Sequence, residues 1–241
     1  MSRKFAKTRC VHCLKYFDQL TSDHVFPKAW YPETTPPNLE KWQVPACFEC
    51  NSKYGKLEDQ LLSKLSWGLE PDAFESLGVT DKIQRSVNPK YARSKRDREK
   101  RLKARKNLLK SLISPTELQL KACLPGFGLH QDFPLEAQPG LFVSASDLTA
   151  FGVKLVKGIT YVLYKKYIES DYKIEIVVAH KEKAIRLIEI VEKYGAQNYC
   201  GPGIRIGVAN LPDDSKTGVY DIEIWGKLRI YGMSFPAELE P

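Results

Sequence analysis

The spacing of apolar and polar residues is most regular after residue 141. A helical period gives way to strict alternation, as in Tyr220, Ile222 and Ile224, which is typical of a half-buried strand. The elements that these patterns predict are a helix over 146–168, a strand over 173–178, a helix over 182–194, a strand over 203–208, and one long strand over 219–235 or two strands interrupted at Gly226. Together they predict a small α+β domain over 141–241 with a mostly antiparallel sheet.

The middle of the chain has a different pattern. Residues 94–113 are rich in helix formers without Gly or Pro, and leucines gather toward the end of this stretch. We therefore expect a helix that is exposed at its start and packed at its end. A second short helix over 116–123 and a Gly- and Pro-punctuated connection over 124–140 complete a basic helical linker, 67–140, which follows an N-terminal segment, 1–66.

The positive charge of the chain is concentrated in this linker. The formal net charge is +8, and residues 81–110 alone hold thirteen Lys and Arg against three acids. A basic helix suits a polyanion, because each phosphate contact releases condensed counterions. The simpler interpretation is a solvated helix whose charge only aids solubility. We favour contact with nucleic acid, through Arg93, Lys95, Arg96, Arg98, Arg101 and Arg105.

Four cysteines form two CxxC pairs, Cys10 with Cys13 and Cys47 with Cys50. Each pair directs two thiolates at one point, so two pairs complete the tetrahedral shell of a structural Zn2+. Protein fills all four positions of such an ion, which leaves none for the activation of water. Metal binding would contribute on the order of 10 kcal/mol to the folding of a short segment with few apolar residues.

The alternative is that the cysteines form disulfides or are ordinary buried thiols. Disulfides need an oxidising compartment, and the N-terminus lacks the apolar stretch of a signal peptide. The sequence contains no run of eighteen apolar residues, so we expect a cytoplasmic chain with reduced thiols and no membrane contact. Cys123 and Cys200 have no CxxC partner and are expected to be ordinary thiols, and His12 is expected at the surface of the first CxxC turn.

Three polar positions accompany the cysteines. Asp23-His24 lies between the two pairs, Asn38 follows fourteen residues after the histidine, and Asn51 comes directly after the last cysteine. In this order and spacing, the segment from Cys10 to about residue 59 resembles the HNH endonucleases, in which a ββα-metal fold combines a four-cysteine zinc site with a catalytic centre. The resemblance covers about fifty of the 241 residues.

The resemblance implies a ββα-metal module over 1–66 that hydrolyses phosphodiester bonds of DNA. It implies that His24 is the general base, that Asp23 and Asn51 hold a catalytic divalent cation, and that Asn38 orients the imidazole. The simplest family pattern has His where this chain has Asn51, and an amide oxygen favours Mg2+ or Mn2+ over a transition metal. Restriction or phage defence are roles that such an enzyme would serve.

The residue types agree with this chemistry without the family. A neutral imidazole is a suitable base near pH 7, and oxygen donors suit a hard cation that stabilises the leaving oxygen. Asp23 and His24 are neighbours on one strand, so their side chains point to opposite faces and the strand must bend for metal and base to meet. The simpler roles are a turn for Asp23-His24 and for Asn38, and a helix N-cap for Asn51.

The sequence leaves two other functions open. A zinc-ribbon nucleic-acid-binding protein would need the cysteines and the basic helix but not His24, and an RNA nuclease would share the phosphate chemistry. Lys53 and Lys56 either contact substrate phosphate or are only solvated. A single-metal site cuts one strand, so double-strand cleavage would need a dimer or two encounters. A homodimer would form through the C-terminal domain, for which the sequence leaves dimerisation, DNA recognition and ligand sensing open.

Overall fold

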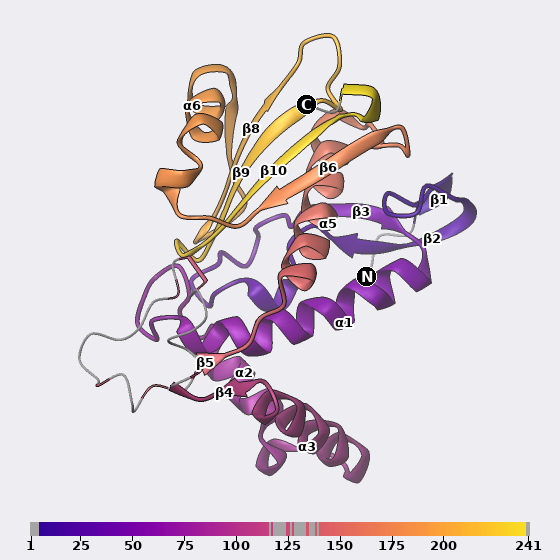
Figure 1. Ribbon diagram of the computed structural model, residues 1–241. Helices are drawn as coiled ribbons and strands as arrows, with labels where there is room; N and C mark the ends of the chain where they lie inside the picture. The colour runs from indigo at the N-terminus through magenta and orange to yellow at the C-terminus, as the bar shows by residue number, and fades with distance from the viewer. Residues whose placement is uncertain are drawn as a thin grey trace.

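The computed structural model describes residues 5–115, 117, 124, 125, 127, 134, 138 and 140–239. The protein is α+β with antiparallel sheets, as the sequence predicts (Figure 1). Most of the expected helix over 116–123 and most of the expected connection over 124–140 lie outside the described residues. Among the helices of the described residues, none is long and apolar enough to cross a membrane.

The N-terminal segment forms a three-stranded antiparallel sheet followed by a long helix. The strands are β1 (Phe5–Arg9), β2 (Tyr16–His24) and β3 (Gln43–Ala46), in the order β1-β2-β3. A 3-10 turn, Lys28–Trp30, follows β2. Helix α1 (Phe48–Leu65) begins directly after β3, so its first turn lies beside the end of the β1-β2 hairpin.

The middle segment is helical, and its basic helix stands out from the body of the molecule (Figure 1). The elements are 3-10 turns at Ser66–Gly68 and Pro89–Tyr91, helices α2 (Val79–Val87) and α3 (Lys95–Leu109), and the short strand β4 (Leu112–Ile113), which pairs with β5 (Gly140–Leu141). The expectation of a packed end for α3 holds only for Leu108, since Leu102, Leu109 and Leu112 are exposed.

The C-terminal segment contains a five-stranded antiparallel sheet in the order β6-β10-β9-β8-β7. Its elements are α5 (Ala145–Tyr164), β6 (Tyr172–Val177), a 3-10 turn (Lys181–Lys183), α6 (Ile185–Tyr194), β7 (Ala196–Tyr199), β8 (Ile204–Asn210), β9 (Gly218–Ile224), β10 (Leu228–Pro236) and a last 3-10 turn (Ala237–Leu239). The run over 219–235 is therefore two strands. They turn at Trp225 and Gly226, whose φ angles of 57° and 67° suit a tight hairpin.

Helices α5 and α6 lie on opposite faces of this sheet. A Cβ on Gly232 of β10 would meet Val156 of α5 at 2.6 Å, and a Cβ on Gly207 of β8 would meet Val191 of α6 at 2.4 Å. In the register of the sheet Gly232 is level with Val208, the neighbour of Gly207, and neighbouring residues on a strand point to opposite faces. The sheet is consequently covered from both sides.

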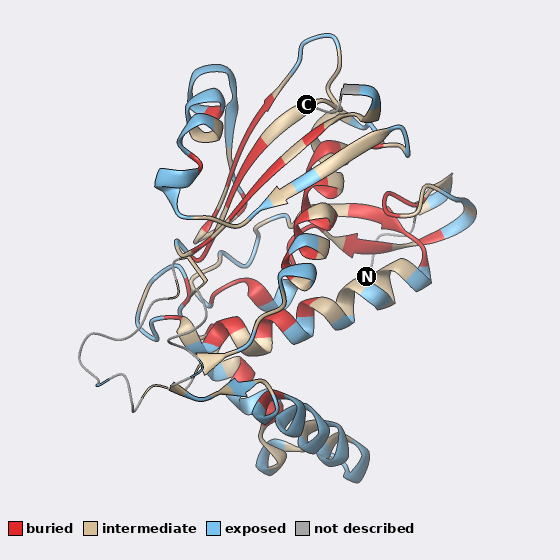
Figure 2. Ribbon diagram, in the orientation of Figure 1, coloured by how far each residue is buried: buried red, intermediate tan, exposed pale blue. Residues whose placement is uncertain are grey.

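One hydrophobic cluster joins the three segments that the sequence predicts (Figure 2). Trp30 stacks on Trp225 with ring centroids 4.8 Å apart, and it lies 4.6 Å from Phe151 of α5. The indole N–H of Trp225 also donates to the carbonyl of Trp30 at 2.7 Å. Gly158 lets α5 approach the end of β2, since a Cβ there would be 3.0 Å from Val25. The N-terminal segment and the large sheet are thus held in one packed core.

Candidate functional site

The four CxxC cysteines meet at one point. Their Sγ atoms all lie within 4.8 Å of one another, and no other such group of His, Cys, Asp or Glu occurs in the part of the chain that the structure describes. The backbone N–H of Cys47 donates to Sγ of Cys10 at 3.3 Å, and that of Cys50 donates to Sγ of Cys47 at 3.4 Å. Four converging sulfurs with N–H donors that stabilise thiolates fit a structural Zn2+.

Asp23 and His12 form a buried pair next to this cluster, so the expectation that His12 lies at the surface is wrong. His12 is 7% exposed, and its Nε2 is 2.9 Å from Oδ2 of Asp23. Its ring lies 4.6 Å from the ring of Tyr54 on α1, and its carbonyl accepts from Nζ of Lys157 at 3.1 Å. Burial lowers the pKa of His12 more than Asp23 raises it, so the neutral imidazole donates to the carboxylate.

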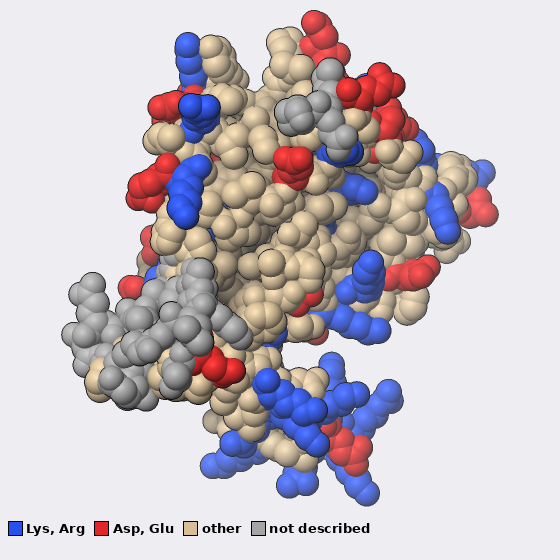
Figure 3. Space-filling view, in the orientation of Figure 1, with Lys and Arg blue, Asp and Glu red and all other residues tan. Residues whose placement is uncertain are grey.

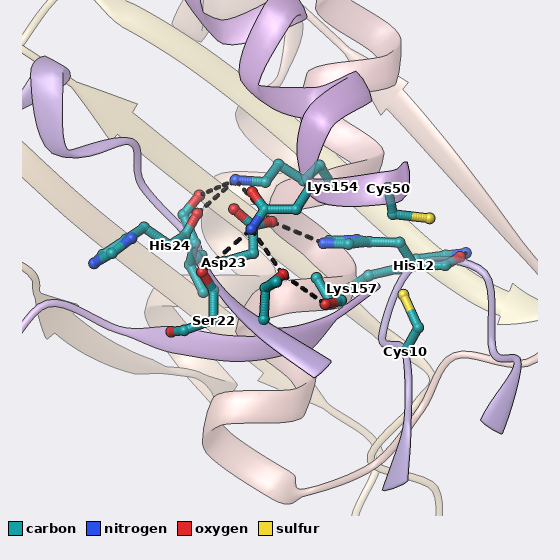
Figure 4. A network of polar contacts seen from close by, with 12 residues as sticks. Cys10, His12, Ser22, Asp23, His24, Cys50, Lys154 and Lys157 are labelled. Carbon is teal, nitrogen blue, oxygen red and sulfur yellow. Dashed lines mark hydrogen bonds and ion pairs between the residues drawn. The ribbon is translucent and has the colours of Figure 1, made fainter. Parts of the chain in front are cut away.

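A lysine from α5 completes the buried network, and no sequence pattern indicates it. Lys154 is 1% exposed, and its Nζ donates to the carbonyls of His24 and Val25 and to Oε1 of Glu58 on α1 (Figure 4). The same Nζ lies 3.4 Å from Oδ2 of Asp23. Burial raises the pKa of Glu58 to about 7, more than the Lys154 ammonium lowers it.

His24 ends β2 and points away from Asp23 (Figure 4). In the sheet it is opposite Gln43 of β3, whose Nε2 lies 3.0 Å from Nε2 of the imidazole. The Ser22 hydroxyl donates to Oε1 of Gln43 at 2.6 Å. Burial, with the charge of Lys28, lowers the pKa of His24 to about 4, which leaves the ring neutral at pH 7.

Asn38 takes the simpler of its two predicted roles, a turn, whereas Asn51 does not take its simpler role, the helix N-cap. Asn38 lies in an exposed turn, and no hydrogen bond among the described residues joins it to His24. Gln43 contacts the imidazole instead, a pairing that becomes visible only with the strand register. Asn51 is not the N-cap of α1, since that place belongs to Cys47.

This arrangement does not fit a divalent cation at Asp23 and Asn51. Oδ2 of Asp23 already receives the His12 N–H and faces the ammonium of Lys154. Nδ2 of Asn51 donates to Oγ1 of Thr21 at 3.0 Å, which turns the amide nitrogen, and not the oxygen, toward β2. A hard cation needs oxygens that converge and are not already neutralised, so Asp23 and Asn51 do not form a site for such an ion.

Basic side chains gather on the projecting helix α3 (Figure 3). The exposed residues among those predicted to contact nucleic acid are Lys53, Lys56, Arg93, Lys95, Arg96, Arg98 and Arg105. Arg101 is different, because its Nε pairs with Asp97 at 3.0 Å and its Nη1 donates to the carbonyl of Arg85. Arg101 thus links α3 to α2 and is less available to nucleic acid.

No protein-family model, curated protein or solved structure matches this chain.

We expect the purified chain to carry roughly one Zn2+, held by the four clustered thiolates. Cys13→Ser removes one ligand and should lower the zinc content and expose the N-terminal segment to proteolysis. Cys200→Ser is the control, since this buried thiol lies outside the cluster. Zinc measured per chain for the three proteins tests the site, and equal zinc in Cys13→Ser and wild type would contradict it.

Glu58 should make the stability of the chain depend on pH. Its pKa rises from an ordinary value of 4.5 to about 7 on folding, so the folded state binds more protons than the unfolded state between these values. The free energy of unfolding should therefore fall as pH rises from about 5 to 7, by on the order of 2 kcal/mol.

Glu58→Gln should remove this part of the pH dependence, whereas Glu192→Gln, at an exposed position of α6, should keep it. Urea unfolding from pH 5 to 8, at a fixed zinc concentration, measures the effect. Parallel curves for wild type and Glu58→Gln would show that Glu58 ionises normally.

Proposed function

We propose that this chain is an endonuclease of the HNH type that hydrolyses phosphodiester bonds of DNA, with His24 as the general base in a zinc-stabilised ββα module. The observation that carries the proposal is the position of His24. It ends a strand whose hairpin is tied to α1 by the cysteine cluster, and its imidazole is neutral and only half-buried. A neutral imidazole within reach of solvent is the group that accepts a proton from an attacking water.

Gln43 would orient the base. Turning its amide by 180° preserves both of its contacts, because the Ser22 hydroxyl can accept as well as donate. Oε1 of Gln43 then accepts the Nε2 proton of His24 and leaves the lone pair of Nδ1 for water. As the water oxygen forms the new P–O bond and one bridging P–O bond breaks, Nδ1 takes the proton, and the leaving oxygen takes one from solvent.

Positive charge surrounds this histidine. The charges of Lys28 and Lys41 both act on the imidazole and contribute to its low pKa, and the same charges suit the scissile phosphate. The spacing of the CxxC pairs indicates neither lysine, because both lie in the connection between β2 and β3. Helix α3 would hold a further stretch of the substrate through its exposed side chains, without reading bases.

A second candidate function is binding of nucleic acid without cleavage. The observation that favours it is the Lys154 ammonium at Asp23, since a binding protein has no need of a carboxylate free for a catalytic ion. The zinc cluster and α3 would serve such a protein equally well. We propose DNA as the substrate. Cleavage of an RNA of equal length, measured beside cleavage of the DNA, distinguishes a DNA nuclease from an RNA nuclease.

We expect wild type to nick supercoiled plasmid and His24→Ala to lose about 100-fold or more of that rate, because a general base contributes this much. His180→Ala, at an exposed position far along the chain, should cut like wild type. The assay is run with Mg2+, with Mn2+ and with a chelator too weak to remove the structural zinc. Equal cutting by His24→Ala and wild type would contradict a base role, and intact binding with no cutting by any protein would favour the second function.

Binding of DNA should depend steeply on salt through α3. Replacing Arg96, Arg98 and Arg105 by Gln should lower the slope of log K against log salt by about 0.9 for each phosphate that the variant no longer neutralises. The control replaces Lys181, Lys183 and Lys193, exposed cations near α6, and should keep the slope. Fluorescence anisotropy of a labelled duplex at several salt concentrations measures it. A slope that falls equally in both triple variants would mean that α3 has no special part in binding.

A further inference from the structure

The ammonium of Lys154 is surrounded as a bound metal ion would be. Four oxygens contact it: the carbonyls of His24 and Val25, a carboxylate oxygen of Glu58 and one of Asp23. Carbonyl and carboxylate oxygens are also the ligands that Mg2+ and Ca2+ take in proteins. A buried ammonium is costly unless it is paired in this way. The polar centre between β2, α1 and α5 thus already contains a cation.

Neighbouring residues fix this cation in place. The side chain of Lys154 is 1% exposed, and a helix that packs in the main core carries it. Asp23 is also held by His12, and both contacts use Oδ2. Asn51, the second expected ligand, is engaged through its amide nitrogen by Thr21 and by the carbonyl of Ser22. No side chain has to move to neutralise Asp23.

We propose that Lys154 is the resident cation of Asp23 and that it keeps a divalent ion from binding at this carboxylate. The C-terminal segment thereby supplies the positive charge at the centre of the N-terminal module. Lys154 is a positioning residue, since its contacts are to Asp23, Glu58 and the backbone at His24 and Val25, and its amine is closed off from solvent. The assignment concerns which cation Asp23 holds, and it stands apart from whether the chain cleaves DNA.

The test measures binding of Mn2+ to the zinc-loaded chain without nucleic acid, by loss of the free Mn2+ signal in electron paramagnetic resonance. The proteins are wild type, Asp23→Asn, Lys154→Met and the double variant Lys154→Met with Asp23→Asn. Zinc content and circular dichroism establish that each is folded.

We expect wild type and Asp23→Asn to bind Mn2+ equally weakly. Lys154→Met should gain a site at least about tenfold tighter, because a charge 3.4 Å from the carboxylate has been removed. That site should disappear in the double variant. Binding by wild type that Asp23→Asn abolishes would overturn the proposal, as would a folded Lys154→Met that gains no site.

Lys154→Met leaves Glu58 without its partner and can unfold for that reason. Lys154→Met combined with Glu58→Gln removes both charges of the buried pair and keeps an oxygen at the place of the Glu58 carboxylate, and the same gain and its reversal by Asp23→Asn are then measured. Since no substrate is present, a failure here leaves the proposed hydrolysis standing, and an inactive nuclease leaves this assignment standing.

Discussion

A lysine ammonium that has lost its water must find oxygens, and in this protein that requirement determines how three elements meet. The Nζ of Lys154 reaches from α5 to the end of β2 and to α1 at once. Apolar packing alone would allow these elements to slide, because the hydrophobic effect has no direction. Buried polar contacts have one geometry, and a partly satisfied network costs more than none. The register of α5 against the N-terminal module is therefore defined by buried polar contacts next to the apolar core.

The same junction explains why the segments predicted from composition are not independent units of packing. The cysteine cluster has only a small apolar neighbourhood, formed by Leu20 and Ala46 with the partly buried Phe5 and Phe17. The rest of the N-terminal segment, including Trp30 and the last turns of α1, belongs to the large cluster that runs through α5 and the sheet. The cysteine cluster and the large hydrophobic cluster thus contact different ends of α1.

Local signals in the sequence predicted much of this arrangement. The CxxC pairs, the alternation over 219–224 and the helix formers over 95–109 each lie within a short window, and each element is present. What the sequence could not supply depends on partners far apart. A lysine on an amphipathic helix is expected to face water. Lys154 is buried instead, because the oxygens that accept from its ammonium belong to residues 96 and 130 positions away in the sequence. Gln43 contacts His24 because the register of β2 and β3 places the two residues opposite each other. His12 contacts Asp23 because of the conformation of the turn between β1 and β2. No residue pattern in the sequence predicts either contact.

Trp225 illustrates a consequence for synthesis of the chain on the ribosome. Its indole donates to the Trp30 carbonyl across 195 positions of sequence, and the two rings stack. The segment that carries the cysteines and His24 emerges before the C-terminal segment, yet one wall of its core arrives only with the β9-β10 hairpin. Contacts between residues far apart in sequence form late. Closing the long loop between them costs conformational entropy, and this cost is offset only once both residues have been made and can pack together. Until that hairpin is made, the face of Trp30 that Trp225 covers in the folded chain lacks this cover. Exposed aromatic surface promotes aggregation, so the nascent chain is a substrate for chaperones at this stage.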